Sequence, residues 1–216
     1  APIRAAYLGV RAFGDAPAPT RSDPERELRL VSCSFLVPLK RVDRIAETVL
    51  LLARARPGRI VRWDHYGDGP ERSRIEARLA AAPETVRAVL HGDTPHETFR
   101  RALRSGAHHV FLHLSGSEGL GLVLAEACEA AVPVVATDAG GVGEVVDDAV
   151  GRLLPVDAPV GAVAVAVDEV APSADALGAA ARARWAERFD MGRTVPAFYD
   201  ALAALVRARR GTRNGS

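Results

Sequence analysis

The chain has 216 residues, which is enough for one α/β domain with a well-buried sheet but short for two full domains. Hydrophobic residues make up 48% and charged residues 25%, and the formal net charge is +1, so the chain as a whole has no general attraction for nucleic acid or an anionic membrane. No run of about 18 apolar residues predicts a membrane span. The N-terminus has neither a signal-peptide pattern nor an initiator Met, so the sequence is compatible with a start partway through a longer polypeptide.

Two cysteines, Cys33 and Cys128, each lie in an apolar stretch far from the other. Two separated thiols do not make a disulfide framework, and a free cysteine usually packs as a small apolar side chain. We therefore predict reduced, core-facing cysteines and a cytoplasmic location.

The predicted elements begin after a segment, residues 1–27, that is rich in Pro, Ala and charge and is expected to be an inter-domain connector with one short strand at 7–10. From Leu28 onward, short apolar runs alternate with longer amphipathic runs. The predicted strands span 28–34, 60–66, 86–90, 109–114, 133–136 and 151–154. The predicted helices between them span 40–53, 71–82, 95–104, 122–131 and 142–146.

The fold class follows from this alternation. Strands separated by one helix each require parallel crossovers, so we predict an α/β fold with a doubly wound, Rossmann-like parallel sheet within a domain spanning 28–190. VFLHL and VPVVAT are apolar without alternation, as buried parallel strands are. Ala-rich helices follow Pro155, where helix is favoured over strand at 160–167. The predicted elements there are helices at 160–167, 175–188 and 193–209, a C-terminal helical unit at 191–210, and a disordered tail at 211–216.

The chemistry of such a sheet lies beyond the carboxyl ends of its strands, in the loops that lead into helices. Four loops qualify by position, and several are rich in glycine. Exposed backbone N–H groups at a helix N-terminus suit an anion, and a phosphate in particular. The four loops span 35–40, 65–70, 115–121 and 137–143.

The most informative stretch is SGSEGLGLVLAE, at 115–126. Gly119 and Gly121 remove side-chain bulk where the helix starts, so a diphosphate could lie there. Glu118 and Glu126 could accept hydrogen bonds from vicinal hydroxyls of a sugar, and Lys40 offers positive charge to phosphate. The alternative from the residues alone is that Glu118 caps the helix and Glu126 is a solvated surface charge.

At this point the sequence resembles a known family. The blocks LVPLKRVD, YGDGPERSRIEARL, LHGDTPHE, VFLHLSGSEGLGLVLAEACEAAVPVVATDAGGVGEVV and GRLLP occur in the order and spacing of the C-terminal domain of glycosyltransferase family 4. The resemblance is strong from about Leu28 to Pro155 and weaker in the C-terminal helices. It implies a GT-B architecture and a retaining enzyme that transfers a hexosyl group from a nucleotide-diphosphate sugar, of UDP or GDP type, to a glycan or lipid-linked acceptor in polysaccharide biosynthesis.

The resemblance also implies roles for particular residues. Glu118 and Lys40 would be the catalytic pair, with Glu118 on the donor sugar hydroxyls and Lys40 on the diphosphate leaving group. Glu126 would contact the ribose of the nucleotide. Charge on the departing diphosphate would be stabilised without a metal or other cofactor. The remaining donor-binding positions would be the backbone at Gly119, Leu120 and Gly121, the base-pocket loop with Gly92 and Thr94, and the crevice wall at Gly67 and Gly69.

Two departures from the family pattern stand out. Phe35 occupies a position where the family often has an Arg that forms a second phosphate clamp, and Arg41 is expected to supply the missing charge. The N-terminal domain, which binds the acceptor in this family, is also absent from the sequence. We therefore expect nucleotide-sugar binding but little or no transfer by this chain alone. The alternative is a catalytically inactive nucleotide-sugar-binding or sensing module of the same fold, for which Phe35 is the main sequence argument.

Rival signals are weaker. The first predicted strand is not followed by G-x-G-x-x-G, and the sequence has no P-loop motif, no Asp-x-Asp and no G-x-S-x-G elbow. His109 and His113 share one strand face but would lie about 13 Å apart, too far to share a metal ion, so packing is favoured for them and for His108. His65 and His96 fall in or near crevice loops, where a plain loop role is favoured over ligand contact.

The Arg-rich C-terminal end, at 207–213, is predicted to be a solvated helix face. The alternative is attraction to an anionic membrane surface, where lipid-linked acceptors reside, which would make the protein peripheral at the inner face of the membrane.

Overall fold

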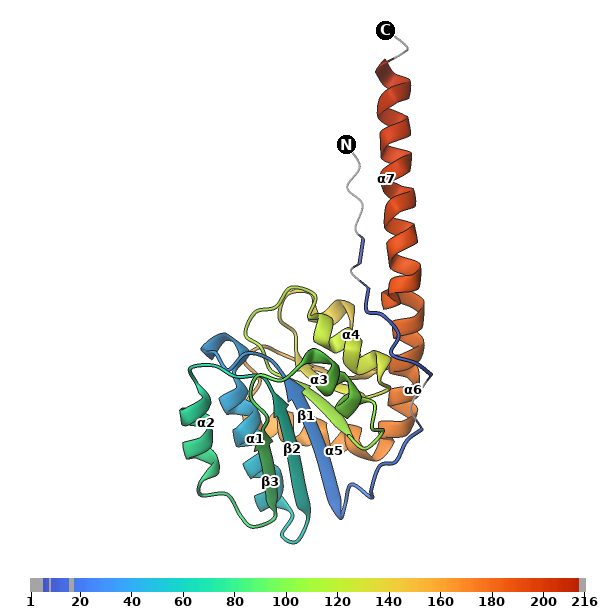
Figure 1. The fold of residues 1–216 in the computed structure, drawn as a ribbon. Helices are drawn as coiled ribbons and strands as arrows, with labels where there is room; N and C mark the ends of the chain where they lie inside the picture. Colours follow the sequence, from blue (N-terminus) through green and yellow to red (C-terminus); the bar gives the residue numbers. More distant parts are fainter. Residues whose placement is uncertain (1–5, 8, 16–17, 214–216) are drawn as a thin grey trace.

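The computed structural model describes residues 6–7, 9–15 and 18–213. Its centre is a six-stranded parallel sheet with the strand order β3-β2-β1-β4-β5-β6, seen in Figure 1. The predicted α/β, Rossmann-like fold is therefore confirmed. The strands are β1 (Glu27–Cys33), β2 (Ile60–Tyr66), β3 (Val86–Leu90), β4 (Val110–His113), β5 (Val134–Thr137) and β6 (Gly151–Leu154).

Helices cover both faces of the sheet. One face packs against α1 (Val42–Ala55), α2 (Arg72–Leu79) and α5 (Val160–Val170). The other packs against α3 (His96–Leu103), α4 (Leu122–Glu129) and α6 (Ala174–Arg184). The central strands β4 and β5 are buried at every position, because helices shield both of their faces.

Most predicted elements are found within a few residues of their expected bounds. The helix favoured over a strand at 160–167 is present as α5. Helix α1 begins at Val42, two residues after the predicted start, because Pro38–Lys40 forms a separate 3₁₀ turn and Arg41 has a left-handed backbone with φ of 50°. That difference decides where the side chains of Lys40 and Arg41 point.

The segment predicted as a connector packs along the domain through its described residues. Val10 is 6% exposed and forms a single parallel bridge with Asp190, in place of the short strand predicted at 7–10, of which residue 8 lies outside the described residues. The backbone N–H of Val10 donates to Phe189 O, and Trp185 Nε1 donates to Val10 O. The attachment combines the buried Val10 side chain with hydrogen bonds to the backbone of Val10, and hydrophobic periodicity does not predict those hydrogen bonds.

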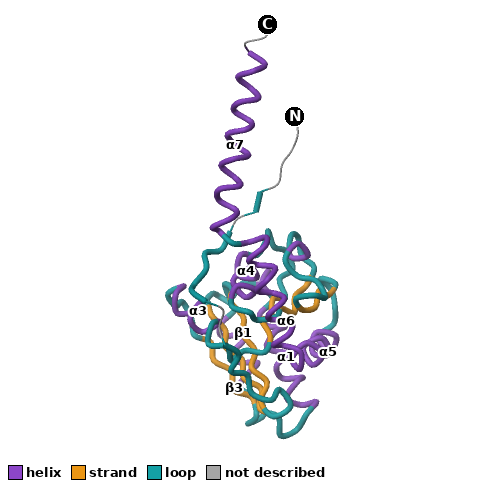
Figure 2. Tube along the Cα trace, turned by 90° about the vertical axis from the view of Figure 1, so that its right-hand side faces the viewer, coloured by secondary structure: helices purple, strands orange, loops and turns teal. Residues whose placement is uncertain are grey.

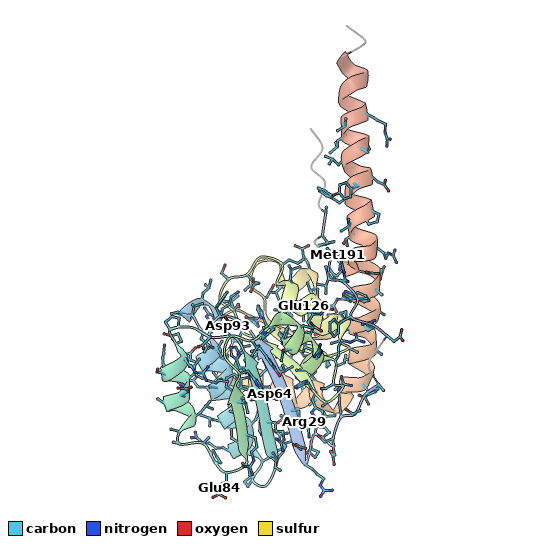
Figure 3. The ribbon with its side chains drawn as sticks, in the orientation of Figure 1. Arg29, Asp64, Glu84, Asp93, Glu126 and Met191 are labelled. Carbon is cyan, nitrogen blue, oxygen red and sulfur yellow. The ribbon has the colours of Figure 1, made fainter. Side chains whose placement is uncertain are left out.

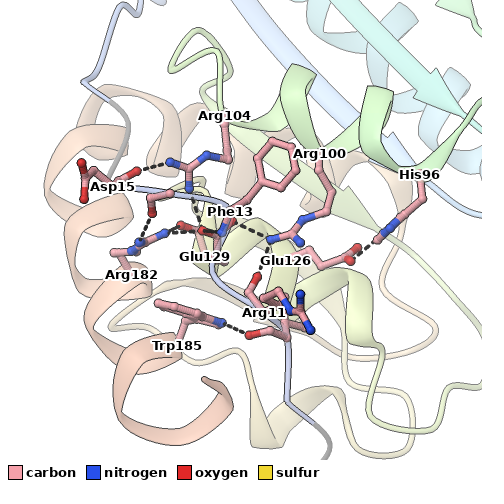
Figure 4. A network of polar contacts seen from close by, with 12 residues as sticks. Arg11, Phe13, Asp15, His96, Arg100, Arg104, Glu126, Glu129, Arg182 and Trp185 are labelled. Atoms are coloured by element: carbon pink, nitrogen blue, oxygen red, sulfur yellow. Dashed lines mark hydrogen bonds and ion pairs between the residues drawn. The ribbon is translucent and has the colours of Figure 1, made fainter. Parts of the chain in front are cut away.

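A buried carboxylate anchors the same segment, as Figure 4 shows. The Glu129 side chain is 1% exposed and lies 3.2 Å from Arg100, 2.6 Å from Arg104 and 2.6 Å from Arg182. We call these four residues the Glu129 cluster. Glu129 also accepts the backbone N–H of Phe13 at 3.1 Å. Because the cluster joins α3, α4 and α6 to residues 11–15, it is a polar core beside the apolar one.

The last helix, α7 (Met191–Arg213), projects away from the domain (Figures 1 and 2). It follows α6 through a π-helical turn, Trp185–Phe189. It extends beyond the predicted 193–209 at both ends, so residues 211–213 of the predicted disordered tail are helical, while 214–216 lie outside the described residues.

Among the helices that the structure describes, none has both the length and the apolar character needed to cross a bilayer. Several large apolar side chains of α7 are exposed: Met191, Val195, Phe198, Leu202, Leu205 and Val206.

Candidate functional site

A cavity of about 640 Å³ opens at the carboxyl ends of the strands. The chain runs outward from β1 to β3 and then returns to β4, so β1 and β4 are neighbours where the strand order reverses. Open doubly wound sheets bind ligands at this point. In Figure 3, Asp93 and Glu126 mark this end of the sheet and Glu84 the opposite end. The cavity is lined by Cys33, Ser34, Phe35, Lys40, Tyr66, Gly67, Asp68, Gly69, Asp93, Thr94, His96, Phe99, His113, Glu118, Gly121, Leu122 and Val123.

Lys40 and Glu118 meet inside this cavity. Lys40 comes from the 3₁₀ turn after β1, and Glu118 comes from the loop between β4 and α4. Lys40 Nζ lies 2.6 Å from Glu118 Oε2, and the two side chains are 21% and 15% exposed. The two residues predicted to act together on a donor thus lie in the same cavity, although they are 78 residues apart in the sequence.

His113 is a site residue that the sequence analysis assigned only to packing. It ends β4, lines the cavity, and its Nε2 lies 3.0 Å from the Glu118 oxygen that Lys40 also contacts. The hydrogen bonds from His113 and Lys40 lower the pKa of Glu118 to about 2, against the opposing effect of burial. Glu118 is therefore a carboxylate at neutral pH, able to accept hydrogen bonds from sugar hydroxyls and unable to donate a proton.

His109, which directly precedes β4, has a different environment. His109 Nδ1 accepts the backbone N–H of Arg29 at 2.9 Å, and His109 Nε2 lies 2.9 Å from Ser22 O, which fixes the ring at the other end of β4 from His113. Within the described part of the chain, no group of three or more His, Cys, Asp or Glu side chains is arranged to hold a metal ion.

The loop that carries Glu118 rests on the loop after β5. A Cβ atom at Gly140, whose φ is 62°, would lie 1.9 Å from Glu118 O, and Gly141 N donates to Gly119 O at 2.8 Å. Only glycine permits this approach. The 137–143 loop was predicted to face the crevice, but none of its residues is among those that line the cavity. Through Gly140 and Gly141 this loop therefore contacts and supports the backbone at residues 118–119 without lining the cavity.

The loops after β1 and β2 also touch. A Cβ atom at Gly67, whose φ is 126°, would lie 2.0 Å from Ser34 O. Gly67 N in turn donates to Gly92 O at 2.9 Å, which ties in the loop after β3. Gly67 and Gly69, predicted for the crevice wall, line the cavity, as does Thr94 of the predicted base-pocket loop. Gly92 of that loop is not among the lining residues and contacts the wall through its hydrogen bond with Gly67.

His65 holds the cavity wall at Ser34 in place. It does so from within strand β2, and not from a loop as its position suggested. Trp63 Nε1 donates to Ser32 Oγ at 2.9 Å, Ser32 Oγ lies 2.8 Å from His65 Nδ1, and His65 Nε2 lies 3.1 Å from Ser34 O. Trp63 can only donate and the Ser34 carbonyl can only accept. These hydrogen bonds therefore all run in one direction. A neutral His65 accepts a hydrogen bond from the Ser32 hydroxyl and donates one to the Ser34 carbonyl.

Burial lowers the pKa of His65 from 6.5 to about 4. The unfolded chain therefore binds the proton first as the pH falls, so this histidine stabilises the fold fully above about pH 6.5 and loses that contribution between about pH 6.5 and pH 4. We expect urea unfolding to show a free-energy loss from about pH 7 to about pH 5 that is about 2 kcal/mol larger for the wild type than for His65→Gln. Equal losses in the two proteins would contradict this assignment.

Glu126 is neither at the cavity surface nor solvated. Its side chain is 11% exposed, so the surface-charge alternative is wrong, and it is absent from the residues that line the cavity. Its Oε1 lies 2.6 Å from Nε2 of His96, which does line the cavity. Burial raises the pKa of Glu126, while His96 opposes that shift. Both residues stand out in the sequence, but their pairing depends on how α3 and α4 are placed in the fold.

Arg41 is not placed to replace the missing clamp. Its left-handed backbone turns the side chain away from Lys40, and Arg41 Nη1 donates to Val156 O at 2.7 Å. The guanidinium lies over Gly116, where a Cβ atom would approach within 2.8 Å of it. Arg41 therefore joins the β4–α4 loop to the segment after β6 and does not line the cavity. Leu120 packs against the apolar core and Gly119 is exposed, whereas Gly121 lines the cavity at the start of α4.

Comparisons with known proteins agree on the family and the fold. A sequence model of the family described as "Glycosyl transferases group 1" matches residues 21–186. A phosphatidylinositol N-acetylglucosaminyltransferase subunit of Arabidopsis thaliana is 32% identical over 121 residues, which are 56% of this chain. The chain thus spans about a quarter of that relative's length, with 26% covered.

Two solved structures share the fold at low sequence identity. The apo form of the lipopolysaccharide outer core galactosyltransferase WaaB gives a TM-score of 0.73 with 18% identity, over 93% of this chain and 55% of the other. A variant of S. aureus TarM, in complex with fondaparinux, α-GlcNAc-glycerol and UDP, gives a TM-score of 0.72 with 21% identity, over 89% of this chain and 38% of the other.

Proposed function

Because the chain belongs to the glycosyl transferases group 1 family, we propose that its cavity holds the nucleoside diphosphate of an activated sugar donor, of UDP or GDP type. The observation that carries the proposal is the meeting of Lys40 and Glu118 at 2.6 Å in one cavity at the reversal of strand order. A cation and a carboxylate side by side suit a ligand that has an anionic diphosphate next to a hydroxyl-rich sugar. The UDP in the TarM complex supports a nucleotide of this class.

In this proposal the chain is the C-terminal, donor-binding domain of a retaining glycosyltransferase of family 4 with a GT-B architecture. The bond between the anomeric carbon and the phosphate oxygen breaks, and the electron pair leaves with the diphosphate. Lys40 and the first turn of α4, whose N-cap residue Gly121 lines the cavity, stabilise that charge without a metal. Glu118, held as a carboxylate, binds hydroxyls of the hexosyl group.

The acceptor is proposed to bind on a further domain, as a glycan or lipid-linked molecule in polysaccharide biosynthesis. The exposed apolar side chains of α7, such as Phe198 and Leu202, support contact with such a domain. We further propose a cytoplasmic protein, with peripheral contact at the inner face of the membrane as the alternative for its Arg-rich end.

Titration calorimetry of this chain with UDP, GDP and ADP tests the proposed function. We expect saturable binding of at least one of them at one site per chain, and protection of the β4–α4 loop from hydrogen exchange in the complex. Flat titrations with all three nucleotides, at concentrations up to a millimolar range, would overturn the donor site whatever the fold.

Phe35 favours a second candidate function, a nucleotide-sugar-binding module without transfer. Its ring lines the cavity and is 72% exposed at a position where an Arg was expected. Arg41 does not compensate, because its guanidinium is engaged with Val156 O. Release of nucleoside diphosphate from a UDP- or GDP-sugar by the full-length protein would exclude this candidate.

A further inference from the structure

His96 stands between Glu126 and the open cavity. It is the first residue of α3, directly after the 91–95 loop, and its side chain is 65% exposed and lines the cavity beside Thr94 and Phe99. Glu126 approaches from α4 and is 11% exposed. His96 thus contacts both the cavity and the carboxylate that is expected to bind ribose.

Apart from His96, the charged groups near Glu126 do not hold its carboxylate in one orientation. The nearby Glu129 carries a like charge, and Arg100 already contacts Glu129 at 3.2 Å and the Arg11 carbonyl at 2.6 Å. Figure 4 shows Arg100 aimed at Glu129 and His96 aimed at Glu126. The contact of 2.6 Å with His96 Nε2 is therefore what fixes Glu126 Oε1.

We propose that His96 is a positioning residue that holds Glu126 so that its second oxygen accepts a hydrogen bond from the ribose diol of a nucleoside diphosphate. This inference rests on the proposed function. In this proposal Nε2 of His96 holds Oε1, and Oε2 is the oxygen that the ligand contacts. A carboxylate held by one partner loses less conformational entropy when it binds a hydroxyl, so the pair favours ribonucleotides over deoxynucleotides. Removing the ligand's hydroxyls should then remove the benefit of His96.

The test compares ligands and variants in one set of titrations. The ligands are UDP, GDP and the 2′,3′-dideoxy form of whichever binds more tightly. The variants are His96→Ala, His96→Gln, whose amide can still donate to Glu126, and the control Glu97→Gln. Glu97 is the next residue on α3 and is absent from the cavity lining; it pairs with Arg101 at 2.5 Å on the helix surface. Thermal unfolding of each variant checks that the fold is retained.

We expect His96→Ala to bind the ribonucleotide about tenfold more weakly, and His96→Gln to recover to within about threefold of the wild type. Both variants should bind the dideoxy ligand within about twofold of the wild type, as should Glu97→Gln for either ligand. Equal losses for the ribo and dideoxy ligands, or no loss for either, would overturn the inference while leaving the donor site standing. A wild type that binds neither UDP nor GDP would overturn the donor site and this inference together.

Discussion

A Lys40→Ala variant is expected to bind UDP or GDP about 30- to 150-fold more weakly than the wild type. A hydrogen bond between charged groups contributes about 2–3 kcal/mol when one partner is removed from a largely buried site, and Lys40 is 21% exposed. The substitution also leaves Glu118 without its cation at 2.6 Å, so the remaining carboxylate repels the diphosphate. Titration calorimetry measures the change in dissociation constant directly.

The matched comparison is Arg41→Gln, one residue along the chain. Arg41 contacts Val156 O and lies over Gly116, so its loss should leave the dissociation constant within about threefold of the wild type while lowering the melting temperature. Equal losses of affinity in both variants would indicate a diffuse electrostatic effect and would contradict a specific role for Lys40.

A Glu129→Ala variant is expected to lower the free energy of unfolding by about 3–5 kcal/mol. The Glu129 carboxylate is 1% exposed, and its removal leaves Arg100, Arg104 and Arg182 without their shared counter-charge in a mostly buried setting. The backbone N–H of Phe13 also loses its acceptor. Urea unfolding measures the free energy, and hydrogen exchange at residues 10–15 should rise because that segment is attached through the cluster.

Glu97→Ala provides the control for this experiment as well. Glu97 pairs with Arg101 on the surface of α3, where both side chains are at least 60% exposed, and exposed pairs of this kind contribute at most about 1 kcal/mol. If Glu129→Ala costs no more than Glu97→Ala, the Glu129 cluster does not anchor the N-terminal segment.

The fold was largely predictable because it depends on patterns that are local in sequence. The unbroken apolar runs of β4 and β5 predicted central strands, and the apolar stripe through Ile45 and Val49 predicted α1. The end of the sheet that holds the cavity also followed, since parallel strands place all of their carboxyl ends together.

The candidate site was predictable only in part, because the spacing of residues in the sequence does not determine which side chains of different elements come into contact. His113 was assigned to packing and His96 to a plain loop role. Their partners Glu118 and Glu126 lie on other elements, and hydrophobic periodicity does not predict how those elements pack. Arg41 was predicted to supply charge to the diphosphate because it is adjacent to Lys40. Its backbone is left-handed, and its side chain contacts Val156 O outside the cavity. The attachment of the N-terminal segment was missed since it uses backbone groups and a buried carboxylate.

The close approach of backbones at Gly67 and Gly140 has a consequence for engineering this chain. Ser34 O and Glu118 O fill the space that a side chain would need there, so even alanine would have to push the neighbouring loop aside. A mutant library aimed at a different sugar or base should therefore leave both glycines fixed. Diversity belongs at Phe35, Thr94 and Leu122, whose side chains line the cavity without holding one loop against another.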